Sequence, residues 1–222
     1  SMYRAEPIWG KPALEEEMVS ESGVKLVIKP HSGFSPGLFL DQREHRSMVR
    51  KMVKSSTVLN LFSYTCGFSV FAATGGAITT SVDVSKKYLN WGRKNFILNE
   101  IPIEKHRFFE EDVLEYLSRA GRRGDSYDFV IVDPPSFGRA GKKTFSLERD
   151  LSVLIQAALK VTAVGGRVFF SCNHRGVSWN HLRAEIVRAA GERLTTFENL
   201  PQTPKDFLPG RYSLTACLVK LD

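Results

Sequence analysis

The chain has 222 residues, of which 42% are hydrophobic and 25% charged, a balance typical of one soluble globular domain. It contains no apolar run near the roughly 18 residues of a membrane span and no signal-peptide core, so we expect a cytoplasmic protein without membrane partners. The three cysteines lack metal-ligand spacing, so no metal site is expected. The formal net charge of +7 is compatible with a polyanionic partner such as RNA, although each basic cluster alone could be a solvated surface.

Residues 1–41 do not follow the pattern of the rest of the chain. They are expected to be an N-terminal extension left from a preceding module, with one exposed strand at 24–29. A helix over 42–54 is then predicted because its apolar residues fall on one face and its basic residues on the other. Buried strands and amphipathic helices should alternate after it: strands at 57–62, 78–82, 107–109, 129–132 and 167–172, and helices from 68, 85, 113, 147 and 178.

This alternation predicts an α/β fold over residues 42–222, with a doubly wound, mostly parallel sheet and helices on both faces. Two final strands, near 194–198 and 212–220, have no helix between them, so they should pair antiparallel. The expected sheet therefore has seven strands, and its last strand runs against the others.

A rigid loop is expected after the strand at 129–132, where Asp133–Phe137 reads Asp-Pro-Pro-Ser-Phe. Two consecutive prolines end the strand and fix the backbone of two residues. The loop therefore holds an acid, a hydroxyl and an aromatic ring at the carboxyl edge of the sheet, where open α/β sheets bind ligands. Taken alone, the same segment is equally consistent with a plain turn at the end of a strand.

A nucleoside site is predicted from the spacing of two earlier segments. The first strand ends in the turn Phe62–Phe68, and Asp83 follows about 20 residues later, the separation at which an acid reaches ribose hydroxyls. Only Gly67 stands where a dinucleotide fingerprint has three glycines, so a ligand without pyrophosphate, such as S-adenosylmethionine, fits better. Asp112 could accept a bond from an adenine amino group, and both acids could also be simple helix-start residues.

Several stretches together resemble the class I S-adenosylmethionine-dependent methyltransferases, and more narrowly the bacterial 23S (large-subunit) ribosomal RNA methyltransferases, with their guanine-N7 and cytosine-5 branches. They are Gly37–Arg43, Asn60–Thr65, Ser81–Ser85, Asp133–Phe137 and Phe170–Asn173. The resemblance runs from about residue 24 to the C-terminus, with Cys66 where that family usually has glycine. It implies a Rossmann-like class I fold, S-adenosylmethionine as cofactor, and a base in RNA, in this family ribosomal RNA, as substrate.

The resemblance also implies roles for individual residues. The reacting centre would contain Asp133, Pro134 and Cys172. The cofactor would be bound by Arg43, Phe62, Ser63, Tyr64, Thr65, Gly67, Asp83, Val84, Asp112, Val113 and Asp133. The RNA would be bound by Phe137, stacking on an unpaired base, and by Arg139, Lys142, Lys143, Asn173, Arg175 and Arg211.

Cys172 separates two chemistries within the resembled family. Cytosine C5 is a poor nucleophile, so a cysteine thiolate must first add to C6, whereas guanine N7 carries its own lone pair. The run Cys172–Gly176 keeps part of the Asn-Asn-Lys-Arg-Gly pattern of the guanine branch, and Phe145 and Arg149 also favour that branch. Cys172 could equally be a small buried residue at a strand end.

Two other functions compete with RNA methylation. Asp-Pro-Pro loops also serve amino-group acceptors, so a protein or small-molecule methyltransferase is one alternative. A cofactor-binding scaffold that contacts RNA without catalysis is the other, and the acids at 83, 112 and 133 speak against it.

Overall fold

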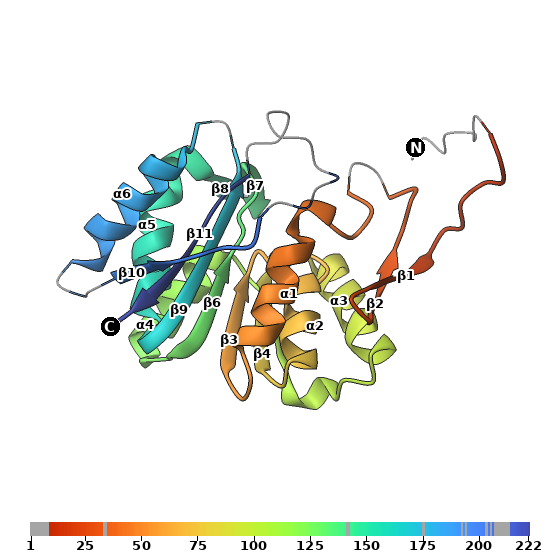
Figure 1. Cartoon of the computed structure of the whole chain (residues 1–222), viewed down its shortest axis with the longest axis horizontal. Coiled ribbons are helices and arrows are strands. Elements are labelled where there is room, and N and C mark those ends of the chain that lie inside the picture. Colours follow the sequence, from red (N-terminus) through yellow and green to blue (C-terminus); the bar gives the residue numbers. More distant parts are fainter. Residues whose placement is uncertain are drawn as a thin grey trace.

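The computed structural model describes residues 9–32, 35–140, 143–174, 176–191, 193, 195–202, 204, 206 and 214–222. Its centre is a seven-stranded sheet with the strand order β10-β11-β9-β6-β3-β4-β5 (Figure 1). The strands are β3 (Thr57–Leu61), β4 (Ile78–Asp83), β5 (Arg107–Glu110), β6 (Tyr127–Val132), β9 (Thr162–Asn173), β10 (Thr195–Glu198) and β11 (Leu214–Leu221). The pairs among β9, β6, β3, β4 and β5 are parallel, and β11 is antiparallel to both of its neighbours, which confirms the predicted fold class.

Helices cover both faces of this sheet (Figure 1). They are α1 (Arg43–Met52), α2 (Gly67–Thr74), α3 (Lys86–Leu98), α4 (Val113–Arg123), α5 (Leu147–Lys160) and α6 (Trp179–Ala190), with short 3-10 turns η1 (Leu40–Gln42) and η2 (Ile103–Lys105). In β6, Phe129 and Ile131 pack with α1 and α2, whereas Val130 and Val132 pack with α4, α5 and α6. The apolar run is continuous because both of its faces are buried.

Three helices begin at the residues that the sequence predicts. Ser85 accepts a hydrogen bond from the Tyr88 amide at 3.4 Å, and Ser178 caps α6 in the same way. The Asp112 carboxylate accepts bonds from the amides of Leu114 and Glu115 at 3.0 and 3.1 Å. Asp112 is therefore a helix cap whatever else it binds.

The N-terminal region forms a hairpin of β1 (Glu17–Glu21) and β2 (Val24–Ile28), and only the second strand was expected. We expected that strand to be exposed, which is wrong for one of its faces: Val24 and Leu26 are buried in a cluster that includes side chains from α2 and α3. The alternation of β2 thus marks one face packed on the domain and one face in solvent. That the hairpin is the end of a preceding module remains a prediction.

Two further features differ from the expectation. A small hairpin of β7 (Phe137–Ala140) and β8 (Lys143–Ser146) follows the Asp-Pro-Pro loop, where no strand was predicted. Strand β9 begins at Thr162, five residues before the predicted start, and Gly165 and Gly166 lie inside it next to a register shift against β6. Glycines inside a strand mark such irregularities, so they did not end the element here.

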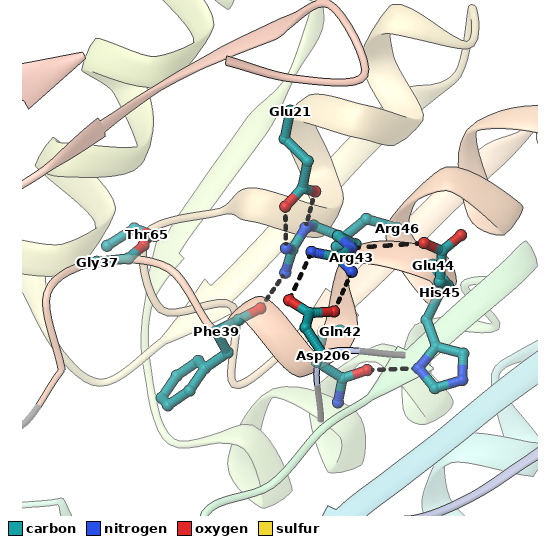
Figure 2. A network of polar contacts seen from close by, with 10 residues as sticks. All are labelled: Glu21, Gly37, Phe39, Gln42, Arg43, Glu44, His45, Arg46, Thr65 and Asp206. Carbon is teal, nitrogen blue, oxygen red and sulfur yellow. Dashed lines mark hydrogen bonds and ion pairs between the residues drawn. The ribbon is translucent and has the colours of Figure 1, made fainter. Parts of the chain in front are cut away.

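A buried ion pair joins the N-terminal hairpin to α1 (Figure 2). The Arg46 guanidinium donates to both carboxylate oxygens of Glu21, at 2.7 and 2.6 Å, and to the Phe39 carbonyl at 2.8 Å. The two side chains are only 3% and 10% exposed. Arg46 therefore holds both β1 and the segment before η1 against the helix.

No helix in the part of the chain that the structure describes is both long and apolar enough to cross a lipid bilayer.

Candidate active site

A cavity of about 510 Å³ opens at the carboxyl ends of the parallel strands. Its volume lies in the range of small-molecule and cofactor sites. Several residues with a predicted cofactor-binding or catalytic role line it: Phe62, Tyr64, Asp83, Val84, Asp112, Val113, Asp133 and Pro134. Asn173, which was predicted to bind substrate, also lines it. The ends of five parallel strands (β3, β4, β5, β6 and β9) thus bring together residues that are far apart in the sequence.

Other predicted cofactor residues lie beside this cavity. Ser63, Thr65 and Gly67 line a small recess of about 70 Å³ that shares Phe62 and Asp133 with the main cavity. The Thr65 hydroxyl donates to the Gly37 carbonyl at 2.6 Å, so its observed role is to hold two loops together (Figure 2).

Arg43 does not line the cavity or the recess, although we predicted that it binds the cofactor. Its guanidinium is paired with the carboxylates of Asp206 and Glu44 (Figure 2). The neighbouring Asp41 and Gln42 line the cavity instead. Consecutive helical residues point roughly 100° apart, so the transition from η1 to α1 turns Arg43 away from the site.

The turn after β3 holds three non-glycine residues in left-handed backbone conformations. The φ angles of Phe62, Tyr64 and Cys66 are 53°, 50° and 60°. Each such residue costs energy, and they concentrate at ligand sites where the surrounding structure enforces them. Here Asp83 enforces the turn, because its Oδ2 accepts a bond from the Tyr64 amide at 2.8 Å.

Cys66 fills the space between this turn and α3. Its thiol is fully buried, and burial raises its pKa to about 12, so it stays protonated at neutral pH. A Cβ atom placed on Gly92 of α3 would come within 2.4 Å of its Sγ atom. The helix can pack this closely on the turn only because residue 92 has no side chain.

The Asp83 carboxylate is oriented by two backbone amides and still has acceptor capacity. Its Oδ1 accepts from the Ser85 amide at 2.9 Å and its Oδ2 from the Tyr64 amide. A carboxylate offers about four acceptor positions, so two remain for hydroxyl groups in the cavity. Burial raises the pKa of Asp83, and these two backbone bonds oppose that shift.

Aromatic side chains that we did not predict complete the wall beside Asp83. The Tyr64 ring lies 4.5 Å from the Tyr88 ring and 5.5 Å from the Phe39 ring, centroid to centroid, and all three line the cavity. Such rings can pack on a purine and attract a cationic sulfur. Phe39 lies inside the segment Gly37–Arg43 that carried the family resemblance, and Tyr88 lies one turn after the Asp83 strand. Their positions near these motifs were the only available signal.

At the other end of the cavity, Asp133 follows β6 and accepts a hydrogen bond from the Ser171 hydroxyl at 2.5 Å. Burial raises the pKa of Asp133 to about 6; the bond from Ser171 lowers it, and the negative charge of Asp41 raises it. Asp41 also lines the cavity, and its own pKa is raised by burial. Near neutral pH, Asp133 is therefore mostly ionised, and negative charge gathers where a cationic cofactor would carry its methyl group.

Cys172 does not line this cavity. It is 2% exposed and packs in the hydrophobic cluster with α5 and α6, because neighbouring strand residues point to opposite faces. Ser171 and Asn173 thus point towards the Asp133 side. Burial raises the pKa of the Cys172 thiol to about 11, and the charge of Asp133 adds to this shift.

The predicted RNA-binding residues are only partly described. Phe137 is 59% exposed at the start of β7, between Ser136 and Gly138, which line the cavity. The backbone of Arg139 and Lys143 lies in the β7–β8 hairpin. Lys142, Arg175 and Arg211 lie outside the described residues, as do the side chains of Arg139 and Lys143. Within the described ranges, no group of three histidine, cysteine, aspartate or glutamate side chains could hold a metal ion.

Sequence comparison finds relatives with a shared chemistry. A family model described as S-adenosylmethionine-dependent methyltransferase matches residues 4–216. "Ribosomal RNA large subunit methyltransferase K" of Neisseria meningitidis serogroup B is 38% identical over 174 residues, which are 77% of this chain and 49% of that protein. "Ribosomal RNA large subunit methyltransferase K/L" of Aeromonas hydrophila is 36% identical over 85% of this chain and 26% of that protein. This chain thus spans half or less of the length of these relatives.

Structural comparison agrees with this result. The crystal structure of SMU.776 complexed with SAH (S-adenosylhomocysteine) superposes with a TM-score of 0.89 and 33% identity, covering 96% of this chain and 58% of that chain. The S-adenosylmethionine-dependent methyltransferase from Agrobacterium tumefaciens shares the fold, with a TM-score of 0.81 and 24% identity over 96% of this chain and 71% of that chain. The family model and the structure with S-adenosylhomocysteine lead to one conclusion: this chain belongs to the S-adenosylmethionine-dependent methyltransferases, and S-adenosylmethionine is its cofactor.

Proposed function

We propose that this chain methylates a base of large-subunit ribosomal RNA, and that the acceptor atom is guanine N7. The relatives named as ribosomal RNA large subunit methyltransferases support the RNA substrate. The observation that carries the choice of atom is the state of Cys172, which is buried, protonated and absent from the described cavity wall.

Methylation of cytosine C5 requires a thiolate that reaches the C6 atom of the base. A thiol with a pKa near 11 is ionised only to about one part in ten thousand at pH 7. The thiol also faces the hydrophobic cluster with α5 and α6 and not the cavity. Both its ionisation and its direction therefore disfavour the covalent route.

Guanine N7 needs no covalent help and no general base, because it carries a lone pair and no proton. When bound, S-adenosylmethionine supplies an electrophilic methyl group on a positively charged sulfur. Asp83 and the aromatic wall of Tyr64 and Tyr88 would hold the nucleoside part, which fixes the distance and angle of attack. A guanine methylated at N7 gains a positive charge, and the carboxylates of Asp133 and Asp41 would stabilise that charge as it develops.

We expect Cys172→Ser to keep its activity within a fewfold of the unmodified chain, because the thiol is not used. The measurement is mass spectrometry of nucleosides from ribosomal RNA that was methylated in vitro, with 7-methylguanosine as the expected product. Cys217→Ser is the matched control, since Cys217 is a second buried thiol in the same cluster. Formation of 5-methylcytidine, or a covalent adduct with RNA that contains 5-fluorocytosine, would show that the proposed acceptor is wrong.

Phe137→Ala is expected to weaken RNA binding by about 1–3 kcal/mol, because its exposed ring would stack on the unpaired target base. Affinity for the cofactor should not change, since Phe137 does not line the cavity. Val164→Ala is a suitable control: Val164 is also exposed, but it lies at the opposite end of the sheet, near the start of β9. Fluorescence titration with labelled RNA at several salt concentrations measures the RNA affinity of both variants and its dependence on salt. Binding that is insensitive to salt would instead indicate an acceptor other than nucleic acid.

A further inference from the structure

Three buried polar residues for which no role was predicted meet beside Asp133, and one of them, Gln42, also lines the cavity. Gln42 ends η1, His45 lies in the first turn of α1, and Ser171 lies near the end of β9. The three residues are only 2–3% exposed. Buried polar groups are costly unless they bond to one another, so their arrangement calls for a physical reason.

The hydrogen bonds among these residues form a series in which each group donates to the next one, ending at Asp133. His45 Nδ1 lies 2.7 Å from Gln42 Oε1 (Figure 2). Gln42 Nε2 donates to Ser171 Oγ at 2.9 Å and to Asp133 Oδ1 at 3.3 Å. Ser171, which already accepts from the amide, donates its single proton to Asp133 Oδ1 at 2.5 Å. In each of these hydrogen bonds the donor lies farther along the series from Asp133 than its acceptor.

This direction fits an ionised Asp133 and conflicts with a protonated one. A carboxylate only accepts, so two donors converging on Oδ1 favour its charged form. If the Gln42 amide were reversed, Oε1 would face the carboxylate and the two oxygens would repel. With the amide in this orientation, Oε1 faces His45, so His45 Nδ1 carries the proton and donates it to Gln42.

His45 can donate this hydrogen bond from Nδ1 because its ring is neutral and is held in place. Burial lowers its pKa to about 4, so at neutral pH the ring carries one proton. The ring packs on Phe169 with centroids 4.9 Å apart, which fixes its orientation. A neutral imidazole with its proton on Nδ1 supports the orientation in which the Gln42 amide donates to Asp133.

The charged groups that face Asp133 have opposite effects on its pKa. Asp41, from η1, disfavours its ionisation, and Arg46, from α1, favours it. The nearby Cys172 thiol from β9 is uncharged at neutral pH. Burial acts in the same direction as Asp41, and the hydrogen bond from Ser171 opposes both. Gln42 is a second donor to the same oxygen, at 3.3 Å.

We propose that His45, Gln42 and Ser171 form a positioning relay that keeps Asp133 ionised and fixes its Oδ1 atom. Both bonds that the described residues make to this carboxylate end on Oδ1, so Oδ2 stays available to the cavity. The role of the relay in catalysis rests on the proposed function, because an anion at Asp133 would stabilise the charge that develops on a methylated base. The ionisation of Asp133 itself does not depend on that function.

The relay is tested by the titration of Asp133 in the whole chain with carbon-13-labelled aspartate. The Asp133 carboxyl signal is assigned by its loss in Asp133→Asn. We expect Ser171→Ala to move the midpoint upwards by about one pH unit or more, since a donor to the charged form is lost. Ser171→Thr restores the hydroxyl and should restore the midpoint. Gln42→Met removes both amide donors at similar size and provides a second, independent variant.

The rate of RNA methylation against pH gives the functional result. A rise in the pKa of Asp133 moves the acid limb of the rate profile to higher pH by the same amount, because the ionised form is the active one. Ser69→Ala is the matched control: Ser69 is also buried and bonded, to Asn60 and Ser81, and makes no bond to the relay.

The outcomes separate the relay from the proposed function. An unmoved Asp133 midpoint in folded Ser171→Ala and Gln42→Met, or an equal shift in Ser69→Ala, overturns the relay even if RNA is methylated. A raised midpoint that Ser171→Thr reverses supports it. If the midpoint rises while the unmodified chain transfers no methyl group to RNA, the relay stands and the proposed function fails.

Discussion

Asp83→Ala is expected to weaken the binding of S-adenosylhomocysteine by about a hundredfold or more. The carboxylate is aligned at the end of β4 by the Ser85 and Tyr64 amides, which leaves acceptor positions for two ribose hydroxyls. Hydrogen bonds to a charged group contribute roughly 1.5–3 kcal/mol each, so the loss of two reaches that factor. The same substitution also releases the Tyr64 amide, which loosens the strained turn after β3.

Isothermal calorimetry measures this effect, and the sheet supplies a matched control. Asp128 lies at the opposite end of β6 and accepts two bonds from Thr57, at 2.7 and 2.8 Å. Asp128→Ala therefore removes a carboxylate with a similar structural role far from the cavity, and it should leave the affinity unchanged. If folded Asp83→Ala binds as tightly as the unmodified chain, the ribose site has been placed at the wrong acid.

Arg46→Met is expected to lower the free energy of unfolding by about 3–5 kcal/mol, because it leaves the buried Glu21 carboxylate without its partner. The Phe39 carbonyl loses its donor as well. The double variant Glu21→Met/Arg46→Met removes both charges, so it should recover much of the loss. Urea unfolding followed by circular dichroism gives the values.

The pair of Arg167 and Glu198 gives the comparison for this second prediction. It is also formed by a guanidinium and a carboxylate, at 2.9 Å, but its side chains are 31% and 24% exposed. Arg167→Met should therefore cost only about 0–1 kcal/mol. A loss for Arg46→Met that is no larger than the loss for Arg167→Met would mean that the clamp on the N-terminal hairpin does not stabilise the domain.

The elements that sequence patterns predicted are those whose causes are local. Caps such as Ser85 and Ser178 act within one turn, and the apolar run in β6 is buried by helices on both faces, so both can be recognised from a few neighbouring residues. The acids Asp83 and Asp133 were placed at the sheet edge for the same reason, since each directly ends a strand pattern. The β7–β8 hairpin was missed because its sequence has no strict alternation, and the Gly141-Lys142 pair between its strands is a weaker hairpin signal than Asn-Gly or Asp-Gly.

The residues that were missed or misplaced depend on contacts between distant parts of the chain. Gln42 bonds to Asp133 and Ser171, which are 91 and 129 positions away, so no local spacing could join them. Arg43 pairs with Asp206, 163 positions away, and turns from the cavity that its neighbour lines. For Cys172 the sequence predicted a strand end, but only the packed structure decides which face of β9 meets the cavity.

The close approach of Cys66 to Gly92 makes these two positions dependent on each other in evolution. With a thiol at position 66, even an alanine at position 92 would overlap the sulfur, so we expect substitutions of Gly92 to be destabilising as long as Cys66 is present. A glycine at position 66, the residue usual in the resembled family, would suit the left-handed backbone and remove the two closest contacts of a Cβ atom at position 92, leaving the Thr65 carbonyl oxygen at 3.3 Å. We therefore expect the two substitutions to occur in one order: a smaller residue at position 66 first, and then a larger residue at position 92. Evolution at the turn after β3 is thus constrained by the residue that α3 carries at position 92.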